Sequence, residues 1–206
     1  MSHYTGPKNR LSRRFGVELF GRRDEKSKRG EAIKKNYPPG QHGQNKLSKP
    51  SEFAKHLMEK QRLRFLFSIT EKQLRRYYQM ASKSKGVTGD ELLTLLERRL
   101  DNVIFRAGLA KTRAQARQIV SHSLINLNGK KVDIPSIQVK VGDLFEVRKA
   151  VKSSPLFEEI RKMKVTLPKW LEVDFKNLTG KIKSLPEKED FEKIVNPQLV
   201  VEYYSK

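Results

Sequence analysis

The chain has 206 residues, with 44 Lys and Arg against 23 Asp and Glu and a formal net charge of +21. An excess of this size predicts a polyanionic partner whose binding weakens steeply with salt. Cysteine is absent, which excludes disulfides and cysteine-based zinc sites. No apolar run approaches the ~20 residues of a membrane-spanning helix, and no signal peptide or lipidation motif is visible. We therefore expect a cytoplasmic protein without a membrane partner.

Residues 1–45 are predicted to be an extended basic arm, because apolar residues are sparse and charges alternate with turn formers. Two interpretations stay open: an arm disordered in the isolated protein, or an extension that orders against RNA. The segment 37–43 (YPPGQHG) favours the second. Its prolines stiffen the chain and its glycines let the backbone approach a ribose or phosphate closely, while His42 could stack on a base or donate to a phosphate.

Two helices are predicted next, over residues 51–67 and 71–82. Phe53, Leu57 and Phe65 are expected to form the buried face of the first helix. The second opens with a capping box of Thr70 and Gln73 and carries a basic margin. Its two tyrosines, at positions 77 and 78, are read as packing residues, with base stacking as the alternative.

A leucine-rich helix is predicted over residues 91–104, opened by a capping box of Thr88 and Glu91 and ended by Gly108 in a left-handed conformation. Asp101 is expected to play a structural part, such as pairing with Arg98 or Arg99. The buried stripe of this helix follows helical spacing and comprises Leu92, Leu96, Leu100, Val103 and Ala107.

A shorter helix is expected after a capping box of Thr112 and Gln115. Arg113 and Arg117 stand one turn apart on it, ~6 Å from each other. Two guanidinium groups at this spacing repel each other unless an anion lies between them. We expect the phosphate backbone of a nucleic acid to supply that anion.

After this helix, the spacing of the hydrophobic residues changes from the helical period of about 3.6 to the period of 2 that is typical of strands. Ile125 and Leu127 lead into Asn128-Gly129, a strong hairpin signal. Further strands are expected at residues 139–141 and 144–147, around the turn at Gly142-Asp143. Two basic helices packed on this small antiparallel sheet make an α+β unit.

The C-terminal part is predicted to hold a helix over residues 156–164, a short strand at 170–174 and a strand-and-loop return over 176–190. The apolar tail must bury itself, either on the earlier helices or on a partner. The expected division is a basic arm at 1–45, a helical domain at 46–96 joined by the tail at about 190–206, an RNA-binding module at 97–160 and its extension at 161–189.

Several of these stretches carry a resemblance to a known family. Residues 99–103 (RLDNV), 112–118 (TRAQARQ) and 125–129 (INLNG) resemble the RNA-binding module named after the fourth protein of the small ribosomal subunit. The flanks extend the resemblance to the bacterial and organellar form of that ribosomal protein family over nearly the whole chain. They are residues 6–8 (GPK), 11–14 (LSRR), 38–43 (PPGQHG), 170–174 (WLEVD) and 201–206 (VEYYSK).

One departure separates this chain from part of the family. Some members carry a four-cysteine zinc site in the arm, and Asn9 and Ser12 stand where two of those cysteines would be. The chain therefore resembles the zinc-free branch, and no metal or other cofactor is expected.

The resemblance implies direct binding to the 5′ domain of small-subunit ribosomal RNA, early in assembly of the subunit body. It also implies a position beside ribosomal protein five of the small subunit, near the messenger-RNA entry channel, with an influence on decoding accuracy. Lys46 and Lys49 match the basic linker that faces messenger RNA in relatives.

The residues expected to contact RNA are basic, amide, aromatic or glycine positions of the arm, the helices and the hairpin. They are Lys8, Arg10, Arg13, Arg14, Tyr37, Gln41, His42, Gly43, Lys60, Arg62, Arg64, Lys72, Arg75, Arg76, Lys83, Arg99, Arg113, Arg117, His122 and Lys130.

An enzymatic function finds no support in the sequence. There is no phosphate-cradling glycine loop followed by Lys-Ser/Thr, no cysteine nucleophile and no histidine pair at ligand spacing, so neither catalytic residues nor a small-molecule substrate are expected. An RNA-modifying enzyme that uses the module for targeting would need a further catalytic domain. Repression of its own messenger, known in some family members, would be an added role of the same surface.

Overall fold

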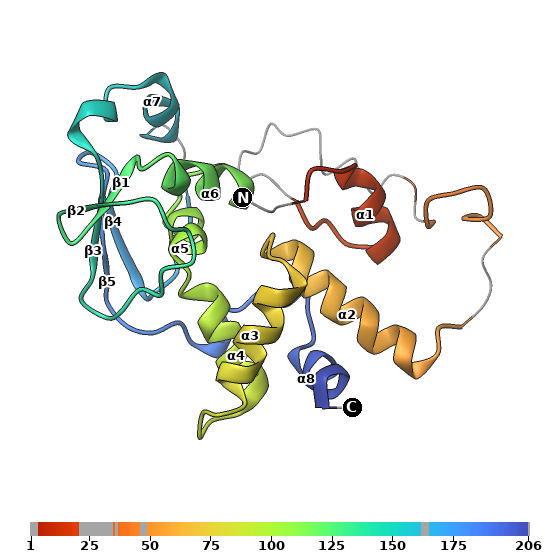
Figure 1. Ribbon diagram of the computed structural model, residues 1–206. Coiled ribbons are helices and arrows are strands. Elements are labelled where there is room, and N and C mark those ends of the chain that lie inside the picture. The colour runs from red at the N-terminus through yellow and green to blue at the C-terminus, as the bar shows by residue number, and fades with distance from the viewer. Residues whose placement is uncertain (1–3, 21–34, 36, 46–48, 162–164, 206) are drawn as a thin grey trace. The chain divides into compact units, whose positions relative to one another are not determined.

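The N-terminal half of the computed structural model is helical, and the C-terminal half carries an antiparallel sheet (Figure 1). The structure describes residues 4–20, 35, 37–45, 49–161 and 165–205. The chain divides into two compact units, Met1–Leu93 with Glu192–Lys206, and Thr94–Phe191, called here the helical unit and the sheet unit. Eight α-helices and five strands among the described residues confirm the α+β class. None of the described helices has the length and apolarity that a membrane crossing requires.

The prediction of an extended arm is wrong for residues 8–15, which form helix α1 (Lys8–Phe15). The helix ends at Gly16, whose positive φ of 66° suits glycine. Phe15 is buried and its ring lies 6.0 Å from that of Phe65, so apolar contact fixes the helix. Ser12 is buried and its Oγ accepts a hydrogen bond from the backbone amide of Leu19 at 3.4 Å.

Helix α2 (Glu52–Leu66) begins at Ser51, whose side chain accepts a hydrogen bond from the Ala54 amide. Its buried face differs from the predicted one. Phe53 is 61% exposed, whereas His56, Lys60 and Leu63 are buried. The reason is polar packing with the last helix: the imidazole of His56 lies 3.0 Å from the carboxylate of Glu202.

Helix α3 (Glu71–Ala81) has the predicted capping box, with hydrogen bonds in both directions between Thr70 and Gln73. Tyr77 is buried, as a packing residue should be. Helix α4 (Thr88–Glu97) begins at Thr88 itself. Since Thr88 is inside the helix, it does not stand at the N-cap position, and the predicted capping box with Glu91 is wrong.

The C-terminal tail forms helix α8 (Pro197–Ser205) and docks internally, on α2 and α3 of the helical unit. The ring of Tyr204 stacks on that of Tyr78 with 4.8 Å between centroids. Its hydroxyl donates to Glu71 at 2.7 Å. Burial, followed by this hydrogen bond to a carboxylate, raises the pKa of Tyr204.

The leucine-rich segment is broken rather than continuous: helix α5 (Leu100–Arg106) follows α4 after an extended residue, Arg99. Arg99 forms an isolated antiparallel bridge with Gln138, and the Leu100 amide donates to the Ile137 carbonyl at 2.9 Å. These long-range bonds replace helical ones at the break. The predicted stripe is nonetheless fully buried, and Gly108 has the expected positive φ of 77°.

Helix α6 (Arg113–Ser121) is capped by Thr112, which accepts a hydrogen bond from the Gln115 amide at 3.1 Å. The Gln115 side chain accepts from the Lys111 amide at 2.7 Å, so the reciprocal half of the capping box is displaced by one residue. Figure 1 shows α5 and α6 together beside the sheet, and buried residues of both helices belong to the sheet unit's core.

The sheet is antiparallel throughout, with strand order β2-β1-β3-β5-β4. Asn128 and Gly129 both have positive φ, as a two-residue hairpin turn requires. The strand predicted at 139–141 is absent, because the Val139 amide donates to the Arg98 carbonyl and the Lys140 amide to the Asp143 carboxylate. The strands are β1 (Ile125–Leu127), β2 (Lys130–Val132), β3 (Leu144–Val147), β4 (Leu171–Asp174) and β5 (Thr179–Ile182).

The core of the sheet unit extends into the C-terminal strands. Trp170 is 1% exposed and belongs to one apolar cluster with residues of α5, α6 and helix α7 (Pro155–Arg161). Gly180 on β5 is required by close packing, since a Cβ there would lie 2.2 Å from the ring of Phe145. Two short 3-10 helices, Lys149–Val151 (η2) and Lys188–Asp190 (η3), complete the unit.

Candidate nucleic-acid interface

A stripe of four exposed cations, called here the α3 stripe, begins on the outer side of α3 with Lys72, Arg75 and Arg76 and ends with Lys83 in the turn after the helix. The three helical cations lie on the side opposite Leu74 and Ala81, with roughly 6 Å between neighbours one turn apart. Among the described residues, none of the four has an acidic partner. Cations held at this spacing without counter-charge suit the phosphates of a nucleic acid.

Helix α1 presents a second group of cations. Arg10 and Arg14 are exposed, whereas Lys8 is half-buried with its amino group 5.8 Å from the Phe20 ring. Arg13 turns back onto the arm: its guanidinium lies 4.8 Å over the Tyr37 ring and donates to the Tyr37 carbonyl at 3.2 Å. Arg13 therefore holds the 37–43 turn in place, and Arg10 and Arg14 remain for an anion.

The turn at 37–43 presents Gln41 and His42 to solvent. Gly43 is buried, and a Cβ at this position would lie 1.9 Å from the Pro38 carbonyl oxygen. The glycine is thus needed to close the turn, and the expectation that its bare backbone meets a ribose or phosphate is wrong. A hydrogen bond with the Gln44 side chain lowers the pKa of Tyr37.

In the sheet unit, Arg99 is committed to an internal ion pair. Its Nε and a terminal nitrogen lie 3.0 and 2.7 Å from the two carboxylate oxygens of Asp101, a bidentate geometry, and the side chain is 1% exposed. The structural role expected for Asp101 is confirmed. An RNA contact by Arg99 is withdrawn, because a guanidinium without accessible surface cannot reach a phosphate.

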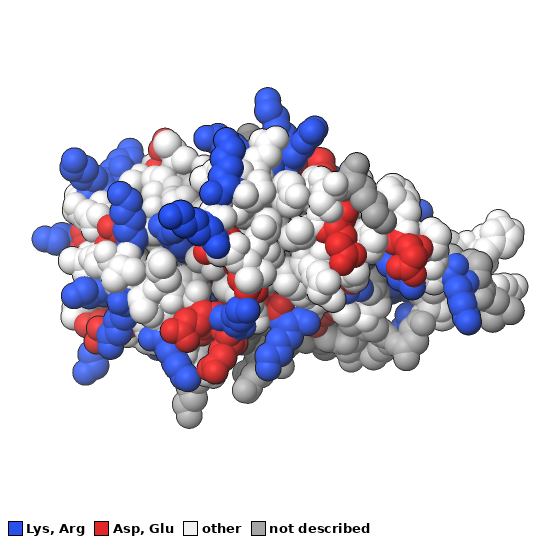
Figure 2. All heavy atoms as spheres, turned by 90° about the horizontal axis from the view of Figure 1, so that it is seen from below, with Lys and Arg blue, Asp and Glu red and all other residues white. Residues whose placement is uncertain are grey.

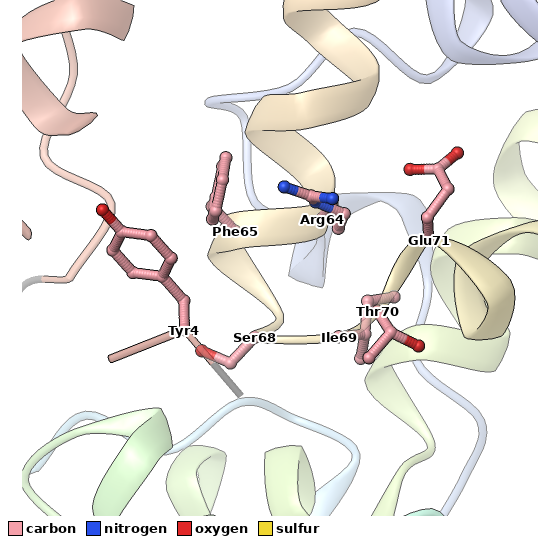
Figure 3. Close-up of a pocket in the computed structure, with 7 residues that line it drawn as sticks. All are labelled: Tyr4, Arg64, Phe65, Ser68, Ile69, Thr70 and Glu71. Atoms are coloured by element: carbon pink, nitrogen blue, oxygen red, sulfur yellow. The ribbon is translucent and has the colours of Figure 1, made fainter. Parts of the chain in front are cut away.

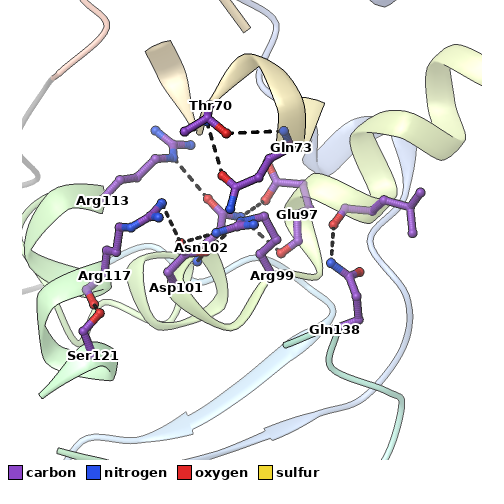
Figure 4. Close-up of polar contacts among 11 residues, drawn as sticks. Thr70, Gln73, Glu97, Arg99, Asp101, Asn102, Arg113, Arg117, Ser121 and Gln138 are labelled. Atoms are coloured by element: carbon purple, nitrogen blue, oxygen red, sulfur yellow. Dashed lines mark hydrogen bonds and ion pairs between the residues drawn. The ribbon is translucent and has the colours of Figure 1, made fainter. Parts of the chain in front are cut away.

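A second buried network surrounds Glu97 (Figure 4). Arg106 donates to both of its carboxylate oxygens, at 2.9 and 2.7 Å, and the side-chain Nδ2 of Asn102 donates to one of them at 2.6 Å. Arg113 in turn donates to the side-chain Oδ1 of Asn102 at 3.1 Å, and its guanidinium lies 4.5 Å over the Phe105 ring. Arg113 is therefore linked to the buried carboxylate of Glu97 through the side-chain amide of Asn102.

Arg117 of α6 has an internal counter-charge. It lies 3.7 Å from the carboxylate of Asp101, and its side chain is 11% exposed. Figure 4 shows the Arg113 and Arg117 side chains extending from α6 towards Asn102 and Asp101. The inference that the spacing of the two arginines requires an external phosphate is wrong for Arg117, since Asp101 supplies its counter-charge.

Two predicted contact residues of α2 also face inwards. Lys60 is 4% exposed, donates to Glu71 at 3.0 Å and lies 4.6 Å over the Tyr203 ring. Arg62 pairs with Glu59 and donates to the carbonyls of Phe15 and Ile194, both at 3.2 Å. Both assignments to RNA are withdrawn, because these side chains tie α1 and the C-terminal segment to α2. Arg64 is half-buried and lines a cleft.

Exposed cations of the sheet unit include predicted and unpredicted residues. Lys130, on the edge strand β2, and His122 are exposed, as an interface requires. Three further exposed lysines, which were not predicted as contact residues, are Lys131, Lys140 and Lys149. For Lys131, the Lys130-Lys131 doublet in the sequence could have indicated it. Figure 2 shows Lys and Arg side chains projecting from the surface with acidic side chains among them. Lys49 is exposed, and Lys46 lies outside the described residues.

No group of three or more His, Asp or Glu side chains that could hold a metal ion occurs among the described residues.

Comparison with known proteins finds two family models that match consecutive parts of the chain. Residues 3–97 match the family described as "Ribosomal protein S4/S9 N-terminal domain", and residues 98–145 match the S4 domain. Full-length relatives named small ribosomal subunit protein uS4 are 48% identical in Caldicellulosiruptor saccharolyticus, 48% in Geotalea daltonii and 47% in Persephonella marina, each with 100% of both chains covered. The family is one of ribosomal structural proteins and not of enzymes. The chain belongs to the uS4 family of small-subunit ribosomal proteins.

Proposed function

We propose that this chain is a structural protein of the small ribosomal subunit, in the cytoplasm, and that it binds ribosomal RNA directly. The observation that supports this best is the α3 stripe, four exposed cations without an acidic partner among the described residues. Phosphate contacts of this kind set the register of a protein on a folded RNA without reading each base. The exposed cations of α1 and β2 add to the same electrostatic attraction.

Within the subunit, the proposed target is the 5′ domain of the ribosomal RNA, with binding early enough to nucleate the subunit body. Two separately packed units, each with its own exposed cations, can hold different RNA helices near the junction where they meet. A clamp on both sides of a junction removes conformations that the free RNA samples, and this favours later assembly steps.

A contribution to the messenger-RNA entry region and to translational accuracy is also proposed, with ribosomal protein five as the neighbour. Lys49 is exposed and has no acidic partner among the described residues. Nearby on α2, Phe53 exposes 61% of its surface, and its ring lies 5.9 Å from that of Tyr203 on α8. An aromatic side chain exposed to this extent is suited to a protein neighbour.

The proposal is tested by measuring affinity for a transcript of the ribosomal-RNA 5′ domain over a range of salt concentrations. Replacing the four cations of the α3 stripe by glutamine should weaken binding and reduce the slope of log K against log salt by about 3. Folding should be unchanged, because these side chains are exposed.

A matched variant removes the same charge elsewhere. Lys169, Lys176, Lys183 and Lys188 are exposed lysines of the sheet unit, and two of them pair with Glu189 and Glu172. Their replacement by glutamine should change the slope much less. Equal slopes for the two variants would show that only net charge matters and would refute a specific role for α3, and failure of the wild-type chain to bind the transcript would refute the function.

A further inference from the structure

A cleft of the helical unit lies between α1, the 37–43 turn and α2, and has a volume of about 620 Å³. This is within the ~300–1,000 Å³ of pockets that take a small molecule. Its apolar wall includes Phe15, Leu57, Met58 and Phe65. Among the described residues that line it, none is acidic and two are arginines, Arg14 and Arg64.

The two arginines give the cleft a positive rim. Arg14 is exposed and Arg64 is half-buried, and neither has an acidic partner among the described residues. An occupant that is apolar and flat inside, and anionic at the rim, matches this distribution. A nucleotide has both properties, since its base has two apolar faces and its phosphate is charged.

Arg64 and Phe65 supply a stacking surface at the cleft. The guanidinium of Arg64 lies 4.5 Å from the centroid of the Phe65 ring. Unpaired RNA bases stack on aromatic rings and on guanidinium planes alike, so a base entering the cleft would meet both surfaces. The cleft also contains a group that could read a base edge: Gln61 lines it, and the Gln61 Oε1 is buried without a hydrogen-bond partner among the described residues.

A second, smaller cleft of about 290 Å³ shares Arg64 and Phe65 (Figure 3). In that view the lining side chains run from Tyr4 through Phe65 and Arg64 to the carboxylate of Glu71. The carboxylate would repel a phosphate, so the larger cleft, which has no acidic side chain among its described lining residues, is the favoured site.

We propose that the larger cleft receives one unpaired nucleotide of the ribosomal RNA, with its base against Phe65 and Arg64 and its phosphate at Arg14. This rests on the proposed function and adds to it a contact that depends on an extruded base, whereas the α3 stripe needs only phosphates. Burial of such a base would let the protein distinguish a junction with an unpaired residue from a regular duplex.

The test uses Phe65→Leu in the full chain, with Phe175→Leu as the matched control, because Phe175 is a half-buried phenylalanine of the sheet unit outside the cleft. Phe65→Leu should weaken binding to the 5′-domain transcript ~10-fold, because stacking on an aromatic ring is lost. The salt slope should stay as in the wild type, because no phosphate contact changes. Phe175→Leu should bind as the wild type does.

Base-specific chemical modification of the transcript supplies a second measurement, made on the wild-type chain. One unpaired base should become protected on binding, and Gln61→Leu should reduce that protection. If no unpaired base is protected, or if Phe65→Leu binds like the wild type, the cleft does not hold a nucleotide, even though the α3 result can still support RNA binding. Unchanged RNA binding with loss of a neighbouring ribosomal protein would assign the cleft to a peptide and overturn the inference.

Discussion

Helix α3 and the segment from Arg99 to the end of α6 both carry arginines, but their guanidinium groups have opposite surroundings. Arg75 and Arg76 are exposed, and no acidic partner exists for them among the described residues. Arg99 and Arg117 converge on Asp101, at 2.7 and 3.7 Å. A cationic side chain is available to bind RNA only where no acidic side chain of the protein lies close enough to pair with it. Net charge therefore predicts that a polyanion binds, whereas the internal ion pairs decide which cations remain for it.

The largest effect is expected from removing the acid of the internal pair. Asp101→Ala should destabilise the sheet unit by about 3–5 kcal/mol, because it leaves the buried Arg99 guanidinium without a counter-charge. Trp170, the single tryptophan of the chain, is buried in this unit, so its fluorescence during urea unfolding reports on it.

Asp133→Ala is the control, since Asp133 is an exposed aspartate of the same unit. Its effect should stay within ~0.5 kcal/mol. A small effect of Asp101→Ala would mean that Arg99 finds water or another acceptor, and the contrast between the two regions would then lose its energetic basis.

A matched pair of substitutions, Arg75→Gln and Arg117→Gln, separates the two classes of arginine directly. Arg75→Gln should lower the salt slope of RNA binding by about 1 and leave the unfolding free energy within ~0.5 kcal/mol. Arg117→Gln should instead cost about 1–2 kcal/mol of stability, because it removes one cation from the buried carboxylate of Asp101. Both quantities are measured on both variants. The reverse result, with Arg117 controlling only the slope, would return α6 to the RNA interface.

Features encoded by neighbouring residues were predicted correctly from the sequence. The Thr70–Gln73 capping box, the Asn128-Gly129 hairpin and the buried leucine stripe each depend on residues within a few turns of one another. The exposed cations of α3 belong to the same class, because they lie opposite an apolar face that is visible in the helical spacing.

Errors arose where a distant segment supplies the partner. The helix break at Arg99 depends on a bridge to Gln138, and the burial of Lys60 depends on Glu71 and Tyr203. Nothing near Arg117 in the sequence indicates that Asp101, on the preceding helix, neutralises it. Assigning individual cations to RNA therefore requires the tertiary structure, whereas predicting the class of partner requires only the sequence.

The smallest effect is expected at Tyr204, in the helical unit. Tyr204→Phe removes the hydrogen bond from its hydroxyl to Glu71 and should cost about 1 kcal/mol at neutral pH. Tyr203→Phe is the control, since that ring makes its contacts with Lys60 and Phe53 through its face and edges.

The effect of Tyr204→Phe should also depend on pH. Because burial and Glu71 raise the pKa of Tyr204 in the folded chain, the phenol ionises first in the unfolded chain, near its ordinary value of about 10. The stabilisation is thus complete below pH ~10 and declines as the pH rises above it. The stability difference between wild type and Tyr204→Phe should shrink over that range. Phenolate absorbance of the two variants checks the assignment, and a difference for Tyr204→Phe that stays constant above pH ~10 would show that its hydroxyl is not held by the carboxylate.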